Sequence, residues 1–187
     1  MSAVKLLVFS GSTRQGSYNT KLATAVAAMA RDLGADVTHV SLDDYAAPLF
    51  DPDWEKANGV PQTITDLGAL MHKADAAFIA SPEYNSGVTP LLKNTIDWLS
   101  RLKPHPFKET VFSLGGASPG TLGGIRGLFS LRTTLVGLNA IVMPEQLTVG
   151  GAASAFNDDG NFANERSAGF ASAQLERLID VAGKLRA

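Results

Sequence analysis

The chain has 187 residues, of which 45% are hydrophobic and 18% charged, and its formal net charge is −2. This length and composition are typical of one globular domain with a sizeable core, and they exclude wholesale disorder. A net charge near zero gives no electrostatic reason to expect binding to nucleic acid or to a charged membrane surface. No apolar run approaches the ~18 residues of a membrane span, and the N-terminus lacks a signal-peptide pattern, so the cytoplasm is the expected location.

Cysteine is absent from the sequence, which removes several chemistries. Without it the chain has no disulfide framework, thiol nucleophile, iron–sulfur cluster or cysteine zinc site. The three histidines, His39, His72 and His105, are far apart and do not have the spacing of metal ligands. We therefore expect no metal site and give none of the histidines a catalytic role.

The first polar loop, residues 10–20, reads S-G-S-T-R-Q-G-S-Y-N-T and lies between an expected strand and an expected helix. Residues 4–9 are almost continuously apolar, as in a parallel strand that is buried on both faces. Apolar residues then recur at helical spacing over 22–29. A loop at this position directs backbone N–H groups and the positive end of a helix toward an anion. We therefore predict a phosphate site here, with Arg14 as a planar cationic partner.

The loop lacks two known nucleotide-binding motifs, and this narrows the class of ligand whose phosphate it could bind. Gly11 and Gly16 have the spacing of a P-loop, but Ser17 and Tyr18 stand where that motif requires Lys and Ser or Thr, which disfavours an ATPase. The dinucleotide pattern G-x-G-x-x-G is absent from the loop as well. A hydroxyl-rich loop suits the terminal phosphate of a mononucleotide, for which FMN is the natural candidate. The alternative is a solvated turn with a helix N-cap at Ser17 or Asn19.

Strand and helix patterns alternate along the rest of the chain without a repeat or a linker, so we expect a single domain over residues 1–187. Further strands are predicted at 36–42, 76–80, 110–114 and 140–143. Helical spacing recurs at 61–71, 89–99, 125–136 and 164–185. Turn-forming residues mark longer connections at 43–59, 103–108 and 150–161. Five strands alternating with five helices predict a doubly wound α/β sheet whose ligands bind beyond the carboxyl ends of the strands.

Two more polar loops follow strands and therefore fall on that same edge of the sheet. Residues 82–85 read P-E-Y-N and combine a turn proline, a flat aromatic ring and an amide, a set suited to a planar heterocycle. Residues 115–120 read G-G-A-S-P-G, and glycine lets another backbone approach closely because it has no Cβ. We expect the three loops together to hold the phosphate, the ring face and the ring edge of one FMN.

Three segments, GSTRQGSYN, SPEYNSGVTPLLKNTIDW and GGASPGTLGG, resemble in order and spacing the NADPH-dependent FMN reductase family, and within it the quinone, azo-dye and chromate reductases. The resemblance covers nearly the whole chain. It implies a three-layer flavodoxin-like fold with a five-stranded parallel sheet, order 2-1-3-4-5, and helices on both faces. It also implies bound FMN, NADPH or NADH as the electron donor, a small-molecule electron acceptor, and a homodimer or homotetramer with active sites near the interface.

Carried over by motif, the resemblance also implies the residues of the site. Those at the phosphate are Ser12, Arg14, Ser17 and Asn19, with the backbone around Thr13 and Gln15. Those at the ring are Pro82, Glu83, Tyr84, Asn85, Gly116, Ser118 and Gly120. No side chain is expected to be catalytic, because the flavin N5 takes the hydride. A flavodoxin-type electron carrier without NAD(P)H oxidase activity is the alternative, although a charge of −2 gives little electrostatic steering for docking.

The helix predicted at 89–99 supplies the expected assembly surface. Its apolar residues, Leu91, Leu92, Ile96, Trp98 and Leu99, occupy more of the helix circumference than one core face requires. We therefore expect a homo-oligomer that buries part of this helix. Arg126 and Glu145 are candidates for an ion pair between subunits. The sequence leaves open the physiological acceptor and the choice between NADPH and NADH.

Overall fold

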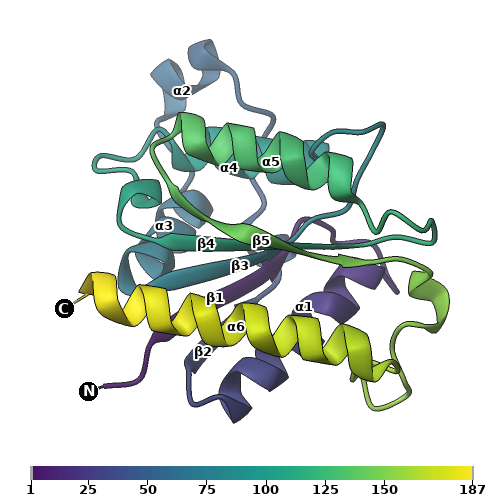
Figure 1. The fold of residues 1–187 in the computed structure, drawn as a ribbon. Helices are drawn as coiled ribbons and strands as arrows, with labels where there is room; N and C mark the ends of the chain where they lie inside the picture. Colours follow the sequence, from purple (N-terminus) through teal and green to yellow (C-terminus); the bar gives the residue numbers. More distant parts are fainter. Residues whose placement is uncertain (1, 187) are drawn as a thin grey trace.

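The computed structural model describes residues 2–186, and its centre is one parallel sheet in the order β2-β1-β3-β4-β5. The strands are β1 (Lys5–Ser10), β2 (Asp36–Val40), β3 (Ala76–Ala80), β4 (Val111–Ala117) and β5 (Ile141–Val149). The helices are α1 (Tyr18–Asp32), α2 (Pro52–Asn58), α3 (Gln62–Lys73), α4 (Pro90–Leu99), α5 (Ile125–Gly137) and α6 (Glu165–Arg186). Helices cover both faces of the sheet (Figure 1), so the predicted three-layer flavodoxin-like fold is confirmed.

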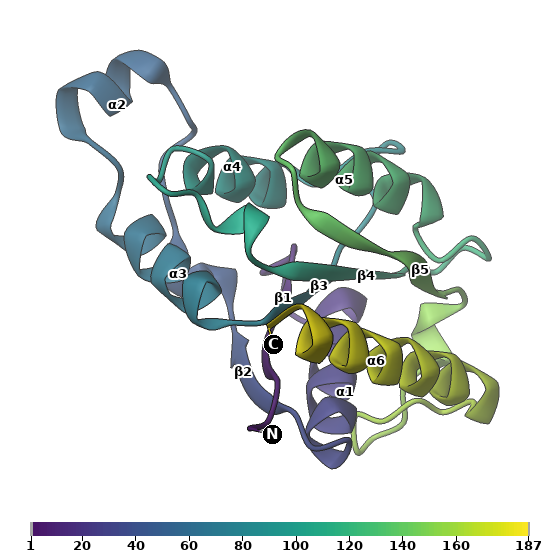
Figure 2. The ribbon, with the colours of Figure 1, turned by 60° about the vertical axis from the view of Figure 1, so that its left-hand side comes forward.

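Two apolar cores lie on the two faces of the sheet, because both faces are covered by helices. Along β1, Leu6 and Val8 pack in the core beneath α1 and α6. Leu7 and Phe9 pack in the core beneath α3, α4 and α5. This period of two is that of a strand, and both sets are apolar because neither meets water. Figure 2 shows the two helix layers on either side of the sheet edge-on. Each fully buried side chain of this size contributes about 1.5–3 kcal/mol of hydrophobic stabilisation.

The connection predicted at 43–59 contains a short 3-10 turn at Leu42–Tyr45 and the helix α2. The sequence D-P-D-W specifies this helix: Asp51 accepts hydrogen bonds from the N–H groups of Asp53 (2.7 Å) and Trp54 (3.2 Å), and Pro52 stands at the first helical position. None of the residues of α2 is buried. Residues 46–61, called the arm below, project from the body of the sheet (Figure 2).

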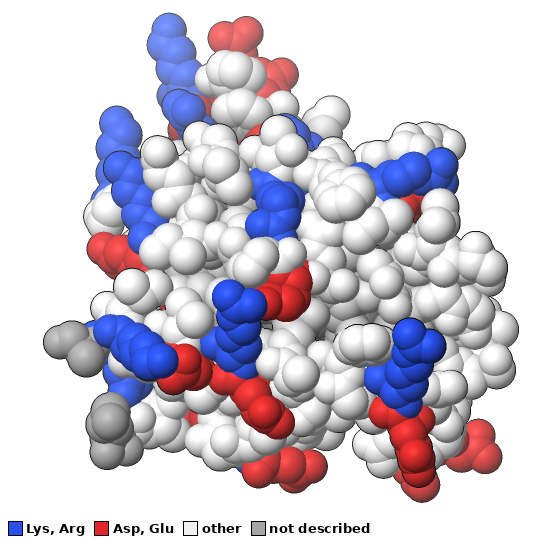
Figure 3. Space-filling view, in the orientation of Figure 1, with Lys and Arg blue, Asp and Glu red and all other residues white. Residues whose placement is uncertain are grey.

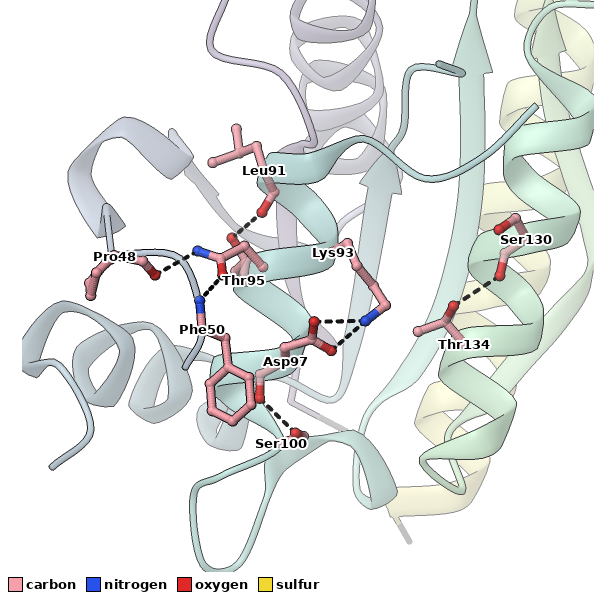
Figure 4. A network of polar contacts seen from close by, with 10 residues as sticks. Pro48, Phe50, Leu91, Lys93, Thr95, Asp97, Ser100, Ser130 and Thr134 are labelled. Carbon is pink, nitrogen blue, oxygen red and sulfur yellow. Dashed lines mark hydrogen bonds and ion pairs between the residues drawn. The ribbon is translucent and has the colours of Figure 1, made fainter. Parts of the chain in front are cut away.

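The arm covers part of the apolar surface of α4, the helix for which the sequence predicted a second subunit. Trp98 is fully buried, and its ring meets those of Phe50 and Trp54 edge-on, with centroids 5.0 and 5.5 Å away. The indole N–H of Trp98 donates to the carbonyl of Pro48 at 2.7 Å, and the amide of Asn94 bonds to the backbone of Pro48 and Phe50. Figure 4 shows Pro48 and Phe50 lying along α4. The homo-oligomer itself stays a prediction.

Strands β4 and β5 are longer than the sequence predicted. Gly115 and Gly116 lie inside β4 rather than in a loop, paired with Leu147 and Thr148 of β5. Position 115 needs a glycine because a Cβ there would come within 2.6 Å of the Phe78 ring. Strand β5 bulges between the pairs Phe112–Val142 and Leu114–Gln146. The buried amide of Gln174 on α6 bonds there to the Ser113 hydroxyl (2.6 Å) and the Leu114 carbonyl (3.1 Å).

Charges of both signs are interspersed over the side of the molecule formed by α5, β5 and α6 (Figure 3). The predicted pair between Arg126 and Glu145 does not form within the chain: Arg126 pairs with Glu83, and Glu145 pairs with Arg177. Both candidates for an ion pair between subunits therefore have partners of their own. Among residues 2–186, no helix is both long enough and apolar enough to cross a membrane.

Candidate functional site

The three polar loops meet at the carboxyl edge of the sheet and form one open groove of about 160 Å³. From the first loop, Ser12, Arg14, Ser17 and Asn19 line it. The second and third loops contribute Pro82, Glu83, Tyr84 and Ser118. The other predicted site residues, Thr13, Gln15, Asn85, Gly116 and Gly120, do not line the groove. The sequence did not single out Tyr18, Ala117 and Pro119, which also line it.

Backbone N–H groups at the start of α1 are available to an anion. The Ser17 hydroxyl caps the helix by accepting the N–H of Asn19 at 3.3 Å, and no acidic residue lies in the first turn. Within residues 2–186, five N–H groups of this loop have no hydrogen-bond acceptor: those of Thr13, Gln15, Gly16, Tyr18 and Thr20. These unpaired donors, at the positive end of a helix dipole, suit a phosphate.

Arg14 is exposed and folds back onto its own loop. Its guanidinium donates to the carbonyls of Gln15 (3.1 Å) and Gly16 (3.5 Å). Gly16 has φ +67°, in the left-handed region that favours glycine, and this turn brings the chain from the loop into the helix. The guanidinium thus lies on the loop that carries the unpaired N–H groups, without an acidic partner among residues 2–186, and adds a positive charge beside these donors.

Asn19 connects the first loop to the third. Its side chain is buried, and its amide both donates to the carbonyl of Ala117 and accepts the N–H of Ala117, each at 2.9 Å. The side-chain amide thus bonds to both backbone groups of Ala117, as the backbone of a neighbouring strand would. Both polar atoms of the amide are therefore used within the protein. The role of Asn19 is to hold the first loop beside the loop that follows β4.

The second loop contains a tight turn from Tyr84 to Gly87. Tyr84 and Gly87 exchange two backbone hydrogen bonds, of 3.2 and 3.0 Å, and the two residues between them, Asn85 and Ser86, have φ +51° and +65°. Positive φ at both central positions is the type I′ geometry, which is strained for residues other than glycine. The ring of Tyr84 is half exposed at the wall of the groove. The Thr89 hydroxyl donates to the Gly11 carbonyl at 2.8 Å and joins this loop to the first.

Glu83 is the one carboxylate among the described residues that line the groove, and its side chain is only 10% exposed. Its oxygens accept the N–H groups of Arg126 and Gly127, both at 3.1 Å, and the Arg126 Nε–H at 2.9 Å. Burial alone would raise the pKa of this carboxyl group. The Gly127 N–H together with the side chain and N–H of Arg126 outweigh burial and lower the pKa, so Glu83 is ionised at neutral pH.

The third loop does not have the chemistry of a hydrolase, although residues 116–120 read G-x-S-x-G. The Ser118 hydroxyl donates to the carbonyl of Gly120 at 3.2 Å, and no histidine within residues 2–186 lines the groove. The glycines here serve close packing, because a Cβ on Gly116 would come within 2.8 Å of the Gly123 carbonyl oxygen. Nor does any group of three or more His, Asp or Glu residues in this range have the arrangement of a metal site.

A larger cleft, of about 570 Å³, lies away from these loops, between β5 and α6. Glu145, Phe170 and Arg177 are among its lining residues. It contains none of the phosphate-loop residues and receives no helix N-terminus. The smaller groove at the carboxyl ends of the strands is therefore the better candidate site, because ligands of doubly wound sheets bind at that edge.

The fold and the groove together define a flavodoxin-like domain with unpaired N–H donors at the start of α1. Residues 4–154 match the family model described as NADPH-dependent FMN reductase. The chain belongs to this family, and the predicted resemblance is confirmed. It is accordingly an NAD(P)H-dependent flavin oxidoreductase whose cofactors are FMN and a nicotinamide donor.

Individual relatives agree with the family assignment. The chain is 36% identical over 149 residues to a quinone reductase of Escherichia coli, covering 79% of this chain and 78% of that protein. It is 32% identical over 177 residues to an NAD(P)H-dependent FMN reductase of Pseudomonas aeruginosa, covering 94% and 93%. Among solved structures, FerB of Paracoccus denitrificans, a flavoenzyme NAD(P)H:acceptor oxidoreductase, superposes with a TM-score of 0.82 at 25% identity, covering 97% and 98%.

Proposed function

We propose that the groove at the carboxyl edge of the sheet holds FMN, and that the enzyme reduces this flavin with NADPH or NADH and then reduces a quinone. The observation that carries the proposal is that one groove is lined by Arg14, by Tyr84 and by other residues of the first loop, the loop in which five N–H groups have no acceptor. Quinones are the first candidate acceptors because the Escherichia coli relative is named a quinone reductase. Azo compounds, free flavin and chromate are further candidates.

The residues of the first loop fit a phosphate ester with two negative charges. In the proposed site, the unpaired N–H groups of the first loop and the hydroxyls of Ser12 and Ser17 donate to the phosphate, and Arg14 turns toward it. The absence of an acidic side chain from the first turn of α1 supports this arrangement, since a carboxylate there would repel the anion.

The residues of the second and third loops fit a planar ring. Pro82 and Tyr84 form one wall in the proposed site, and Ala117, Ser118 and Pro119 form another. When bound, FMN supplies the hydride chemistry, and the protein supplies orientation and a shaped wall. We therefore assign no acid, base or nucleophile to the side chains of the groove.

We also propose a homodimer or homotetramer in which a second copy completes each site. The groove of one chain measures about 160 Å³, well below the ~300–1,000 Å³ of a typical ligand pocket, and it is open on one side. A neighbouring copy over the open side would supply the missing wall. A single domain over residues 1–187 and a cytoplasmic location remain part of the proposal.

The direct test is an absorbance spectrum of the purified protein loaded with FMN, recorded without oxygen before and after NADPH is added. The proposal expects the flavin to bind and its visible absorbance to disappear when NADPH is added, then to return when a quinone is added. A flavin that stays oxidised with NADPH would indicate an electron carrier of the flavodoxin type. A protein that takes up no FMN would overturn the proposed site.

A further inference from the structure

Helix α5 begins without a cap from its own segment. Its N-cap residue is Gly124, at φ +87°, which has no side chain, and the first turn contains no acidic residue. The N–H groups of Arg126 and Gly127 would therefore lack a partner at the start of the helix. Glu83 supplies that partner from more than forty residues away: its Oε2 accepts both N–H groups at 3.1 Å.

The carboxylate of Glu83 is fully occupied by α5. Its Oε1 accepts the Nε–H of Arg126 at 2.9 Å and lies 2.6 Å from Nη2 of the same guanidinium. With only 10% of its side chain exposed, Glu83 faces α5 rather than water. The charge is thus balanced by a helix N-terminus and a guanidinium, which together satisfy both oxygens.

Glycines let the second loop lie directly against α5. A Cβ on Gly127 would be 3.0 Å from the Cβ of Glu83 and 3.1 Å from its Cα. A Cβ on Gly124 would be 3.7 Å from the same Cβ. The backbone of Glu83 therefore rests on the first turn of α5 at a distance that a larger residue at position 127 would not permit without a shift.

The residue after Glu83 begins the left-handed turn at the wall of the groove. Asn85 and Ser86 hold positive φ values that cost energy for residues other than glycine, and such geometry persists only where the surrounding structure enforces it. The exposed side of the turn offers little such enforcement, since Tyr84, Asn85 and Ser86 are all exposed. The turn is attached on both sides, by Glu83 to α5 before it and by Thr89 to the Gly11 carbonyl after it, and only the Glu83 contact adjoins Tyr84 directly.

We infer that Glu83 is a positioning residue: its buried carboxylate caps α5 and thereby fixes the Tyr84–Gly87 turn as one wall of the groove. The inference rests on the proposed function only in naming FMN as the ligand of that groove. It differs from the role carried over by resemblance, in which Glu83 contacts the flavin, because both carboxylate oxygens are already used by α5.

The contact of Glu83 with the start of α5, called the anchor below, is tested without flavin. The protein is purified and freed of cofactor, and the hydrogen exchange of its backbone amides is measured. Glu83→Ala should speed exchange at Arg126, Gly127 and the 84–87 turn, and Glu83→Gln should give a smaller change because its amide oxygen still accepts one N–H. Glu55→Ala is the matched control, since Glu55 forms a comparable pair with Arg101 (2.9 Å) on the arm, away from the groove. It should leave exchange at 84–87 and 126–127 unchanged.

The link to the site is tested by titrating the same variants with FMN and recording visible circular dichroism at saturation. Glu83→Ala should weaken FMN binding by about tenfold or more, the scale expected when charge-assisted bonds are lost. Its saturated spectrum should differ from that of the unaltered protein, because the wall of the groove has moved, whereas a residue that only stabilises the fold would leave this spectrum unchanged. Glu83→Gln should recover part of both effects.

The outcomes separate the inference from the proposed function. If the unaltered protein binds no FMN but Glu83→Ala still releases the 84–87 and 126–127 amides, the anchor stands and the proposed cofactor site fails. If FMN binds and Glu83→Ala matches the unaltered protein in exchange, affinity and saturated spectrum, the inference is overturned. Should Glu83→Ala fail to fold, Glu83→Gln decides by the same three measurements, because it keeps the size of the side chain.

Discussion

The first loop, residues 10–20, and the Tyr84–Gly87 turn both contribute to the groove, but they are held in different ways. The first follows from its own residues: Ser17 caps α1, Gly16 makes the left-handed turn, and the N–H groups are free because a helix starts there. The turn depends on remote partners, chiefly the attachment of Glu83 to α5. One wall of the site is thus encoded locally, and the other is encoded by tertiary contacts.

The largest effect should come from breaking the connection between the two walls. Asn19→Ala removes both bonds to Ala117 and leaves a buried N–H and a buried carbonyl without partners, which should cost on the order of 3 kcal/mol of unfolding free energy. Urea denaturation measures this. Asn58→Ala is the control, since its amide bonds to Trp54 at an exposed site, and it should change stability by less than about 0.5 kcal/mol. Equal effects of the two variants would contradict the role given to Asn19.

The second-largest effect should come from the first loop, residues 10–20, and tests that loop alone. Arg14→Ala should weaken FMN binding by about 1.5–3 kcal/mol, the usual contribution of a charge-assisted contact, and leave folding stability nearly unchanged because the side chain is exposed. Titration of the cofactor-free protein with FMN measures the first quantity, and thermal unfolding the second. Lys21→Ala, an exposed cation on α1 that does not line the groove, should change neither. An unchanged affinity in Arg14→Ala would remove this residue from the phosphate site.

A smaller effect, the pH dependence of the unfolding free energy, tests the contact of Glu83 with α5. The pKa of Glu83 is lowered in the folded state, so its contribution to stability is present above the ordinary glutamate value and is lost as the pH falls through the folded pKa. The difference in unfolding free energy between the unaltered protein and Glu83→Gln should therefore be constant at neutral pH and shrink in acid. Denaturant unfolding across the acidic range measures it. A difference that grows as the pH falls would show the opposite shift and contradict the anchor.

The smallest effect is expected at the tip of the turn. Tyr84→Phe keeps the ring that forms the wall and removes a hydroxyl that has no hydrogen-bond partner within residues 2–186, so the rate of flavin reduction should stay within about twofold. Stopped-flow measurement of flavin bleaching by NADPH tests this. Abolished reduction with FMN fully bound would give the phenol a chemical role that our account denies.

The same distinction explains what the sequence alone predicted. The doubly wound sheet, the first polar loop and the edge on which the loops meet follow from short patterns of apolar residues, glycine and hydroxyls, whereas the sheet order came from the family resemblance. The roles of Asn19 and Glu83 could not be predicted, because their partners, Ala117 and α5, lie far away in the sequence and take part largely through backbone N–H and carbonyl groups. Backbone partners leave no signature in a residue pattern.

Two features of the structure were not predicted, for different reasons. Helix α2 was missed although its local signal was present, since Asp51 and Pro52 form an ordinary helix start. The cover over α4 could not have been predicted, because burial of Trp98 depends on Phe50 and Trp54 folding back from the arm. An apolar helix surface in a sequence does not reveal whether the same chain or another copy covers it.

The central claim is that the start of α1 holds the phosphate of FMN, and a paired titration with FMN and riboflavin tests it most directly. Riboflavin carries the same ring without the phosphate. The free N–H groups and Arg14 predict that FMN binds at least about 100-fold more tightly, and that Arg14→Ala reduces this preference. Equal affinity for the two flavins would contradict the account.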